Sequence, residues 1–90
     1  MVRFLRSATK HRISRARSRY VVEHYEVVGL AAPPSGAKQE RIVFLGADAD
    51  GVLLEVIALA AADGDVLVIH AMPMREQYRR HYEEARRWQS

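Results

Sequence analysis

The sequence predicts a single α+β domain with an N-terminal helix, a mainly antiparallel four-stranded sheet and a C-terminal helix. Three observations predict it. Ninety residues are too few to form two separate cores. Apolar residues recur at helical spacing near both ends of the chain, and four short β-branched runs lie between them. We therefore expect residues 1–90 to fold as a single domain.

The first predicted helix spans about Arg15–His24. Ser14 is a typical residue for its N-cap, because the side-chain oxygen accepts a hydrogen bond from a free N–H group of the first turn. We expect the buried side to contain Ile13, Ala16, Tyr20, Val21 and His24, which recur at helical spacing. Before this helix, Phe4–His11 is compatible with a short strand or with a turn of helix, and the residues do not decide between them.

Two strands and a loop are expected next. Tyr25–Leu30 is rich in β-branched and aromatic residues, which favours a strand. Ala31–Lys38 contains Pro33, Pro34 and Gly36 and is therefore a loop. Arg41–Leu45 is predicted to be the second strand, ended by the turn Gly46–Gly51.

The last two strands form a predicted hairpin. Val52–Ala60 is apolar and is interrupted only by Glu55. Asp63-Gly64 indicates a tight turn, because these residues tolerate the positive φ that such turns require. Val66–Ala71 pairs back, and its nearly continuous apolar character predicts a central strand covered on both faces. Pro73 ends this strand.

The C-terminal segment predicts a second amphipathic helix. Its apolar stripe consists of Met74, Tyr78, Tyr82 (or His81), Ala85 and Trp88. Trp88 is interpreted either as a packing anchor or as part of a partner interface. Core packing is favoured over base stacking for Tyr78 and Tyr82.

The positive charge is concentrated at the two ends of the chain. Residues 1–22 carry seven Lys or Arg and no acid, residues 23–73 have a net charge of −6, and residues 74–90 have a net charge of +2. Two basic ends around an acidic middle predict a surface for a polyanion or for an acidic partner.

Several classes of protein are excluded or disfavoured. The absence of cysteine excludes disulfides, thiol catalysis and cysteine-based zinc sites. No apolar run is long enough to span a membrane and no secretory signal is visible, so we expect a cytoplasmic location. Asp48-x-Asp50-Gly51 lacks the further ligands of a calcium loop and is expected to be a plain turn. We expect no metal.

The order of several short motifs resembles the BrnT-like toxins, a branch of the RelE-type ribonuclease toxins. Lys10-His11-x-Ile13-Ser14 resembles the KHGVS segment of that family. Glu40-Arg41, Leu45-Gly46, Gly51, Leu54-x-Val56 and Ile69-His70-Ala71 resemble its strand pattern, and Arg79, Arg80, Tyr82 and Glu83 match its closing helix. The resemblance covers roughly residues 8–84. Met72 stands where the family has an arginine, and Tyr78 stands where it has a glutamate.

The resemblance implies a small RelE-like fold, RNA cleavage that inhibits translation, no metal or organic cofactor, and a cognate antitoxin that neutralises the toxin. The reaction of such toxins is attack of an RNA 2′-hydroxyl on the adjacent phosphate, which requires proton transfer and cations. We predict His70, Arg75, Tyr78 and Arg79 for chemistry and phosphate contact. We predict Lys10, His11, Arg12, Arg41 and Arg80 for RNA binding.

Simpler interpretations stand beside these predictions. For His70 the favoured interpretation is a hydrogen-bonded structural histidine. For the arginines, a solvated helix face and phosphate contact are weighed evenly. A non-catalytic RNA- or protein-binding module on the same fold is the main alternative function. A homodimer that completes a small core is a third.

Overall fold

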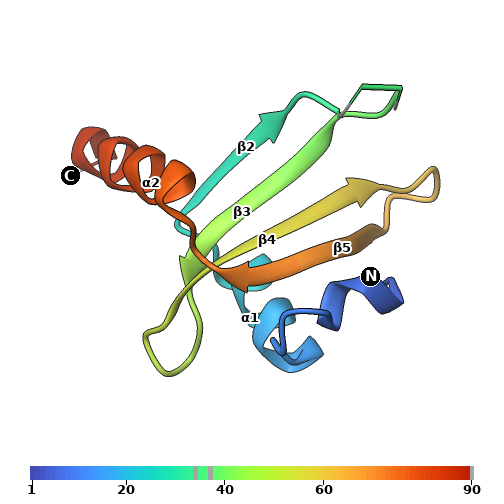
Figure 1. The fold of residues 1–90 in the computed structure, drawn as a ribbon, viewed down its shortest axis with the longest axis horizontal. Coiled ribbons are helices and arrows are strands. Elements are labelled where there is room, and N and C mark those ends of the chain that lie inside the picture. Colours follow the sequence, from blue (N-terminus) through green and yellow to red (C-terminus); the bar gives the residue numbers. More distant parts are fainter. Residues whose placement is uncertain (34, 37, 90) are drawn as a thin grey trace.

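A computed structural model of the chain describes residues 1–33, 35, 36 and 38–89. The elements in chain order are β1 (Val2–Phe4), the 3-10 helix η1 (Arg6–Thr9), α1 (Arg15–His24), β2 (Val27–Ala31), β3 (Arg41–Ala47), β4 (Leu53–Ala60), β5 (Val66–Pro73) and α2 (Glu76–Gln89). The strands form one sheet in the order β1-β5-β4-β3-β2 (Figure 1). Pro34 and Ala37 of the expected loop lie outside the described residues. The predicted α+β class is confirmed.

The sheet has five strands and is mixed, whereas the sequence predicted four strands in a mainly antiparallel arrangement. The additional strand is β1, which runs parallel to β5 from the pair Val2↔Val66 to the pair Phe4↔Val68. The structure also decides the conformation of Phe4–His11, which the sequence left open between a strand and a turn of helix. Phe4 ends the strand β1, and the 3-10 helix η1 follows it. A strand of three residues carries too little periodicity to be recognised, and its partner lies more than sixty positions away. β5 is an interior strand, as predicted.

Two apolar clusters cover opposite faces of the sheet. The first lies beneath α1 and η1 and includes Val21, Phe44, Leu54, Val56 and Val68. The second lies on the face that carries α2 and includes Val43, Leu45, Ile57, Met74 and Tyr82. The alternation of side chains along β3 and β4 assigns neighbouring residues to opposite clusters. Residues of β3, β4 and β5 that share the second face are therefore positioned next to α2.

α1 has the predicted bounds and the predicted cap. Ser14 lies just before it, and its Oγ accepts a hydrogen bond from the Arg17 N–H at 3.2 Å. The predicted buried side is wrong except for Ile13 and Val21, which are buried. Ala16, Tyr20 and His24 are exposed, and the last two stack on each other in solvent with 4.1 Å between ring centroids.

The side chain that takes their place against the sheet is Ser18, which is 1% exposed. Beside it the Arg17 guanidinium donates to the Asp48 carboxylate at 2.8 Å, and this ion pair fixes the rotation of α1 toward the β3–β4 turn. A small residue at position 18 lets the helix approach the strands closely. A pattern based on apolar residues alone does not detect a buried serine.

Both predicted turns are present. In the hairpin between β4 and β5, Gly64 has a φ of 89° and the Asp63 carboxylate accepts from the Asp65 N–H at 3.0 Å. In the β3–β4 turn the Asp48 carboxylate accepts from the N–H groups of Asp50 and Val52, both at 2.9 Å. The bond from Val52 is the largest cause of the lowered pKa of Asp48. Asp48 thus closes a turn, as expected.

A metal-binding group and a membrane-spanning helix are both absent from the described residues. Among them, no group of three or more acidic or histidine side chains is arranged to hold a metal ion. None of their helices combines the length and the apolar character needed to cross a membrane.

Candidate functional site

The predicted chemical residues converge on the sheet face that carries α2. In the strand register Ile57 lies opposite both Val43 and His70, and Glu55 lies opposite Met72. Opposite residues of antiparallel strands project from the same face, so His70 and Glu55 share this face. Arg41 is two residues before Val43 in β3, so its side chain projects from this same face of the sheet. α2 begins shortly after β5 ends, which brings Arg75 and Tyr78 beside the same strands.

Glu55 is the centre of this site. Its carboxylate is completely buried in β4. Oε1 accepts from the backbone N–H of Arg75 at 2.8 Å, and Oε2 accepts from Arg75 Nη2 at 2.7 Å and from His70 Nε2 at 3.1 Å. Burial alone would raise the pKa of Glu55, but the hydrogen bonds from His70 and Arg75 outweigh it and lower the pKa from 4.5 to about 2. Glu55 is therefore ionised at neutral pH.

The ionised carboxylate fixes the orientation and tautomer of His70. Because a carboxylate without a proton only accepts hydrogen bonds, His70 Nε2 must carry a hydrogen. Nδ1 of the neutral ring is then left with its lone pair and is able to take a proton. The side chain is 23% exposed, so the ring remains accessible to a substrate. A bulge in β5 beside Ile57 and Ala58 precedes this position, and bulges commonly redirect a side chain near a site.

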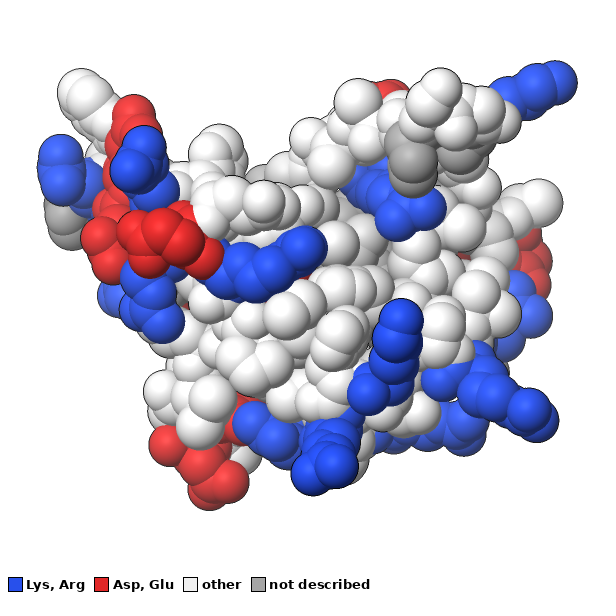
Figure 2. All heavy atoms as spheres, in the orientation of Figure 1, with Lys and Arg blue, Asp and Glu red and all other residues white. Residues whose placement is uncertain are grey.

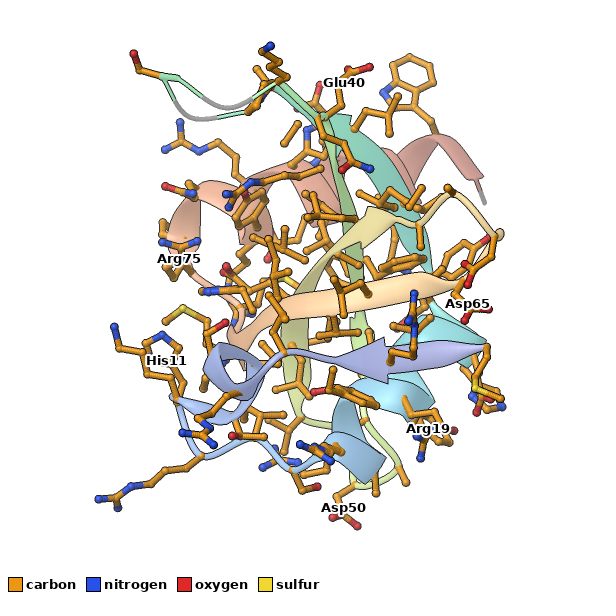
Figure 3. The ribbon with its side chains drawn as sticks, turned by 90° about the vertical axis from the view of Figure 1, so that its right-hand side faces the viewer. His11, Arg19, Glu40, Asp50, Asp65 and Arg75 are labelled. Carbon is orange, nitrogen blue, oxygen red and sulfur yellow. The ribbon has the colours of Figure 1, made fainter. Side chains whose placement is uncertain are left out.

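His11 lies against His70. The two ring centroids are 5.4 Å apart in an edge-to-face arrangement. η1 makes this contact possible, because Ser7 Oγ donates to the Ile69 carbonyl at 3.0 Å and so fixes the N-terminal segment beside β5. Figure 3 shows His11 and Arg75 toward one side of the molecule and Arg19 and Asp65 toward the other. The N-terminal segment and the C-terminal half thus share one site.

Arg75 connects this site to α2. Its guanidinium lies over the Tyr78 ring at 5.6 Å, and its carbonyl accepts from the N–H groups of Tyr78 and Arg79, both at 2.9 Å. The hydrogen bond to Glu55 is the main cause of its raised pKa. The charge of Arg75 is balanced by Glu55, so Arg75 supplies less net positive charge than the sequence suggests. We call Glu55, His70, Arg75, His11 and Tyr78 the Glu55 cluster.

The other predicted cations lie outside this cluster. Within the described part of the chain, no hydrogen bond or ion pair links their side chains to an acid; they are Lys10, Arg12, Arg41, Arg79 and Arg80. Figure 2 shows Lys and Arg side chains arranged around a largely uncharged area on one face. Arg41 and Arg79 are half-buried, and the other three are exposed. Their charges are thus available to an anion.

Glu26 forms a second polar contact that holds α2 on the sheet. Its Oε1 accepts from Tyr82 Oη at 3.1 Å, and Arg86 Nη1 lies 3.4 Å from its Oε2. Tyr82 is 4% exposed, which confirms core packing for this tyrosine and selects it over the exposed His81. Burial, followed by the hydrogen bond to Glu26, raises the pKa of Tyr82. Trp88 is 81% exposed and is not a packing anchor.

Sequence reasoning missed Glu55 as a site residue. The signal was present, because Glu55 is the one charged residue in an otherwise apolar strand, and buried acids are rare unless they are paired. Of the predicted residues, His70 and Arg75 contact Glu55 directly. His11 contacts His70, and Tyr78 contacts Arg75. Comparison of the chain with family models, with curated proteins and with solved structures gave no match.

Proposed function

We propose that this chain is an RNA-cleaving toxin of the BrnT-like, RelE-type kind, which acts in the bacterial cytoplasm and inhibits translation. The observation that carries the proposal is the arrangement of His70. It is oriented by a buried, ionised carboxylate, contacts a second imidazole and lies on a sheet face bordered by unpaired arginines. The motif order described above supports the same function.

His70 is the proton acceptor in this proposal. Nδ1 takes the proton of an RNA 2′-hydroxyl as the 2′-oxygen bonds to the adjacent phosphorus. The bond from phosphorus to the 5′-oxygen then breaks, and a proton delivered to that oxygen completes the exchange, leaving a 2′,3′-cyclic phosphate and a 5′-hydroxyl. Glu55 stabilises the imidazolium formed on His70, because its charge lies 3.1 Å from Nε2.

Two side chains of the cluster are candidates for the second proton transfer, His11 and Tyr78. The His11 ring contacts His70 directly. The Tyr78 ring instead contacts the Arg75 guanidinium through its face. We therefore assign leaving-group protonation to His11. In this assignment Tyr78 serves at the edge of the site, and Arg75 positions Glu55 and His70.

Phosphate binding falls to the unpaired cations. Arg41 projects from the same sheet face as His70, and Arg79 follows Arg75 by one helical turn. These two are assigned to the reacting phosphate. Lys10, Arg12 and Arg80 are exposed and are assigned to flanking phosphates of the RNA.

A cleavage assay with purified protein tests the proposal. The substrate is a single-stranded RNA, and an oligonucleotide with one 2′-deoxy position controls for attack by the 2′-oxygen. His70→Ala should slow cleavage about 100-fold or more, the usual contribution of a proton-transfer group. His24→Ala is the matched control and should leave the rate unchanged, since the His24 ring bonds to and stacks on Tyr20 at the exposed side of α1.

Equal cleavage by wild type and His70→Ala would overturn the proposal, and so would intact RNA at every pH. Expression in a bacterium gives a second measurement. Wild type should arrest growth and deplete mRNA, while the double variant His70→Ala/Arg79→Ala should do neither.

The second candidate function is a non-catalytic RNA- or protein-binding module. The specific observation in its favour is that Glu55 balances the charge of Arg75, so one predicted phosphate contact is already occupied. Met72 in place of the family arginine favours it too. RNA that is retarded in a gel but never cut would select this module over the enzyme.

The proposal includes a cognate antitoxin as partner. Trp88 is 81% exposed and belongs to neither apolar cluster, which favours a partner interface for it. A homodimer through this residue is the other assembly to test. Light scattering of the purified chain distinguishes them, because a strict monomer excludes the homodimer.

A further inference from the structure

A small apolar hollow lies next to the Glu55 cluster on the same sheet face. Its volume is about 160 Å³. Its lining comes from the β2 and β3 strands and from α2: Val27, Gly29, Leu30, Ala31, Val43, Leu45, Tyr78 and His81. Pockets for drug-sized ligands occupy roughly 300–1,000 Å³, so this hollow admits one ring system and not a whole nucleotide.

The chemistry of the hollow suits a flat heteroaromatic ring. Two of its lining residues, Tyr78 and His81, are aromatic and come from consecutive turns of α2. Val43 and Leu45 are buried residues of β3 and give an apolar floor. Aromatic side chains beside an apolar floor bind unpaired bases by stacking, largely independently of sequence.

Gly29 keeps the hollow open. It lies opposite Val43 in the register, so a side chain at position 29 would project into the same face. A Cβ placed there would meet no atom within 4 Å. The glycine thus leaves space that the neighbouring residues do not fill.

Tyr78 is shared by the hollow and the Glu55 cluster. One contact of its ring is with Arg75, which holds Glu55, and the same residue lines the hollow. Arg41 lies opposite Ala31, another lining residue, and places an unpaired cation at the rim. The phosphate of a base in the hollow would therefore be within the positive field of Arg41, and Tyr78 links the hollow to the Glu55 cluster.

We infer that this hollow is a nucleobase subsite that holds one unpaired base beside the scissile phosphate. The inference rests on the proposed function for its biological meaning, but base binding is measurable without cleavage. The inference names the ligand of the hollow, a nucleobase, and places that base beside the Glu55 cluster.

The experiment uses NMR titration of the full chain with nucleoside 5′-monophosphates, and with ribose 5-phosphate as the probe without a base. The monophosphates should shift the amide signals of Gly29, Ala31 and Val43, and ribose 5-phosphate should not. Gly29→Leu fills the hollow and should weaken nucleotide binding about tenfold. Gly29→Ala is the matched control, because it adds one methyl group at the same place and leaves most of the volume open.

His81→Ala tests the aromatic lining with a residue outside the Glu55 cluster and should also weaken binding. The inference is overturned if nucleotides and ribose 5-phosphate shift the same signals, or if Gly29→Leu binds nucleotides as wild type does. Far-UV circular dichroism confirms that each variant is folded. If RNA is not cleaved but nucleotides still bind in the hollow, the proposed enzyme fails and the subsite stands.

Discussion

At the scale of single residues, Glu55 determines what the site can do. An acid in the middle of a buried strand is costly unless its oxygens are hydrogen-bonded, and here both oxygens accept from Arg75 and one also accepts from His70. The same bonds give His70 its tautomer. Stability and site geometry are therefore coupled through one carboxylate.

Glu55→Gln should lower the free energy of unfolding by about 1–3 kcal/mol, because charge-assisted bonds are replaced by weaker amide contacts in a buried position. Urea denaturation at pH 7 measures this change. Glu40→Gln is the control, since Glu40 is exposed and should change stability by less than about 0.5 kcal/mol. Equal effects of the two substitutions would contradict the role assigned to Glu55.

The pH dependence of stability follows from the same residue. The pKa of Glu55 is about 2 in the folded protein, against 4.5 for a glutamate without these contacts, as in the unfolded chain. The folded state therefore favours the ionised form. This contribution is fully present above pH 4.5 and is lost as the pH falls toward 2. Thermal melts from pH 6 to pH 2 should therefore show a smaller decline for Glu55→Gln than for wild type. A steeper decline in the variant would contradict the sign of the shift.

At the scale of elements, the parts predicted from sequence are those that local residues specify. Ser14 and the helical spacing predicted α1 with its bounds, and Asp63-Gly64 predicted the hairpin of β4 and β5. β1 was missed because three residues become a strand only by pairing with Val66–Val68 at the other end of the chain. Long-range pairing of this kind leaves no local signal.

In the candidate site, too, some residues could be predicted from local sequence and others depend on the fold. His70, Arg75 and Tyr78 were found because their residue types suit the chemistry. Glu55 was not, because its role depends on the partners that the fold brings to it. The buried side of α1 failed for a related reason, since Ser18 is buried through the approach of α1 to the sheet and not through its own hydrophobicity.

The cap of α1 gives an element-scale prediction. Ser14→Ala removes the acceptor for the Arg17 N–H and should cost about 1 kcal/mol of stability. Ser35→Ala is the control, because Ser35 is exposed and lies outside every helix and strand. Denaturant midpoints of the two variants, compared at one pH, give the measurement. An unchanged midpoint for Ser14→Ala would show that the cap contributes nothing.

The packing of β3 against the start of β2 gives a second prediction at the scale of elements. A Cβ at Gly46 would lie 3.3 Å from the Glu26 backbone nitrogen and 3.5 Å from the Tyr25 Cα, and backbone atoms cannot move aside cheaply. Gly46→Ala should therefore lower the melting temperature. Gly29→Ala, in the neighbouring strand with open space around its Cβ, should leave it unchanged or raise it slightly. The opposite ranking would contradict this account of the β2–β3 pair.

At the scale of the whole molecule, the fold separates paired from unpaired charge. Of the seven cations in residues 1–22, Arg3 pairs with Asp63 and Asp65, and Arg17 pairs with Asp48. Within the part of the chain that the structure describes, the remaining five have no carboxylate partner: Arg6, Lys10, Arg12, Arg15 and Arg19. The N-terminal segment therefore keeps most of its positive charge after folding, and two of these cations, Lys10 and Arg12, adjoin His11 in the chain.

This distribution predicts how RNA binding responds to salt. Each phosphate neutralised on a single strand contributes about −0.7 to the slope of log K against log salt. Lys10→Ala/Arg12→Ala removes two unpaired cations beside His11 and should reduce the magnitude of the slope by about 1.4. Arg3→Ala is the control, because its charge is already balanced by two aspartates, and the slope should stay near that of wild type. Fluorescence anisotropy of a labelled single-stranded RNA between 50 and 300 mM salt measures all three. The same reduction in both variants would mean that RNA responds to total charge and not to the unpaired cations beside the site.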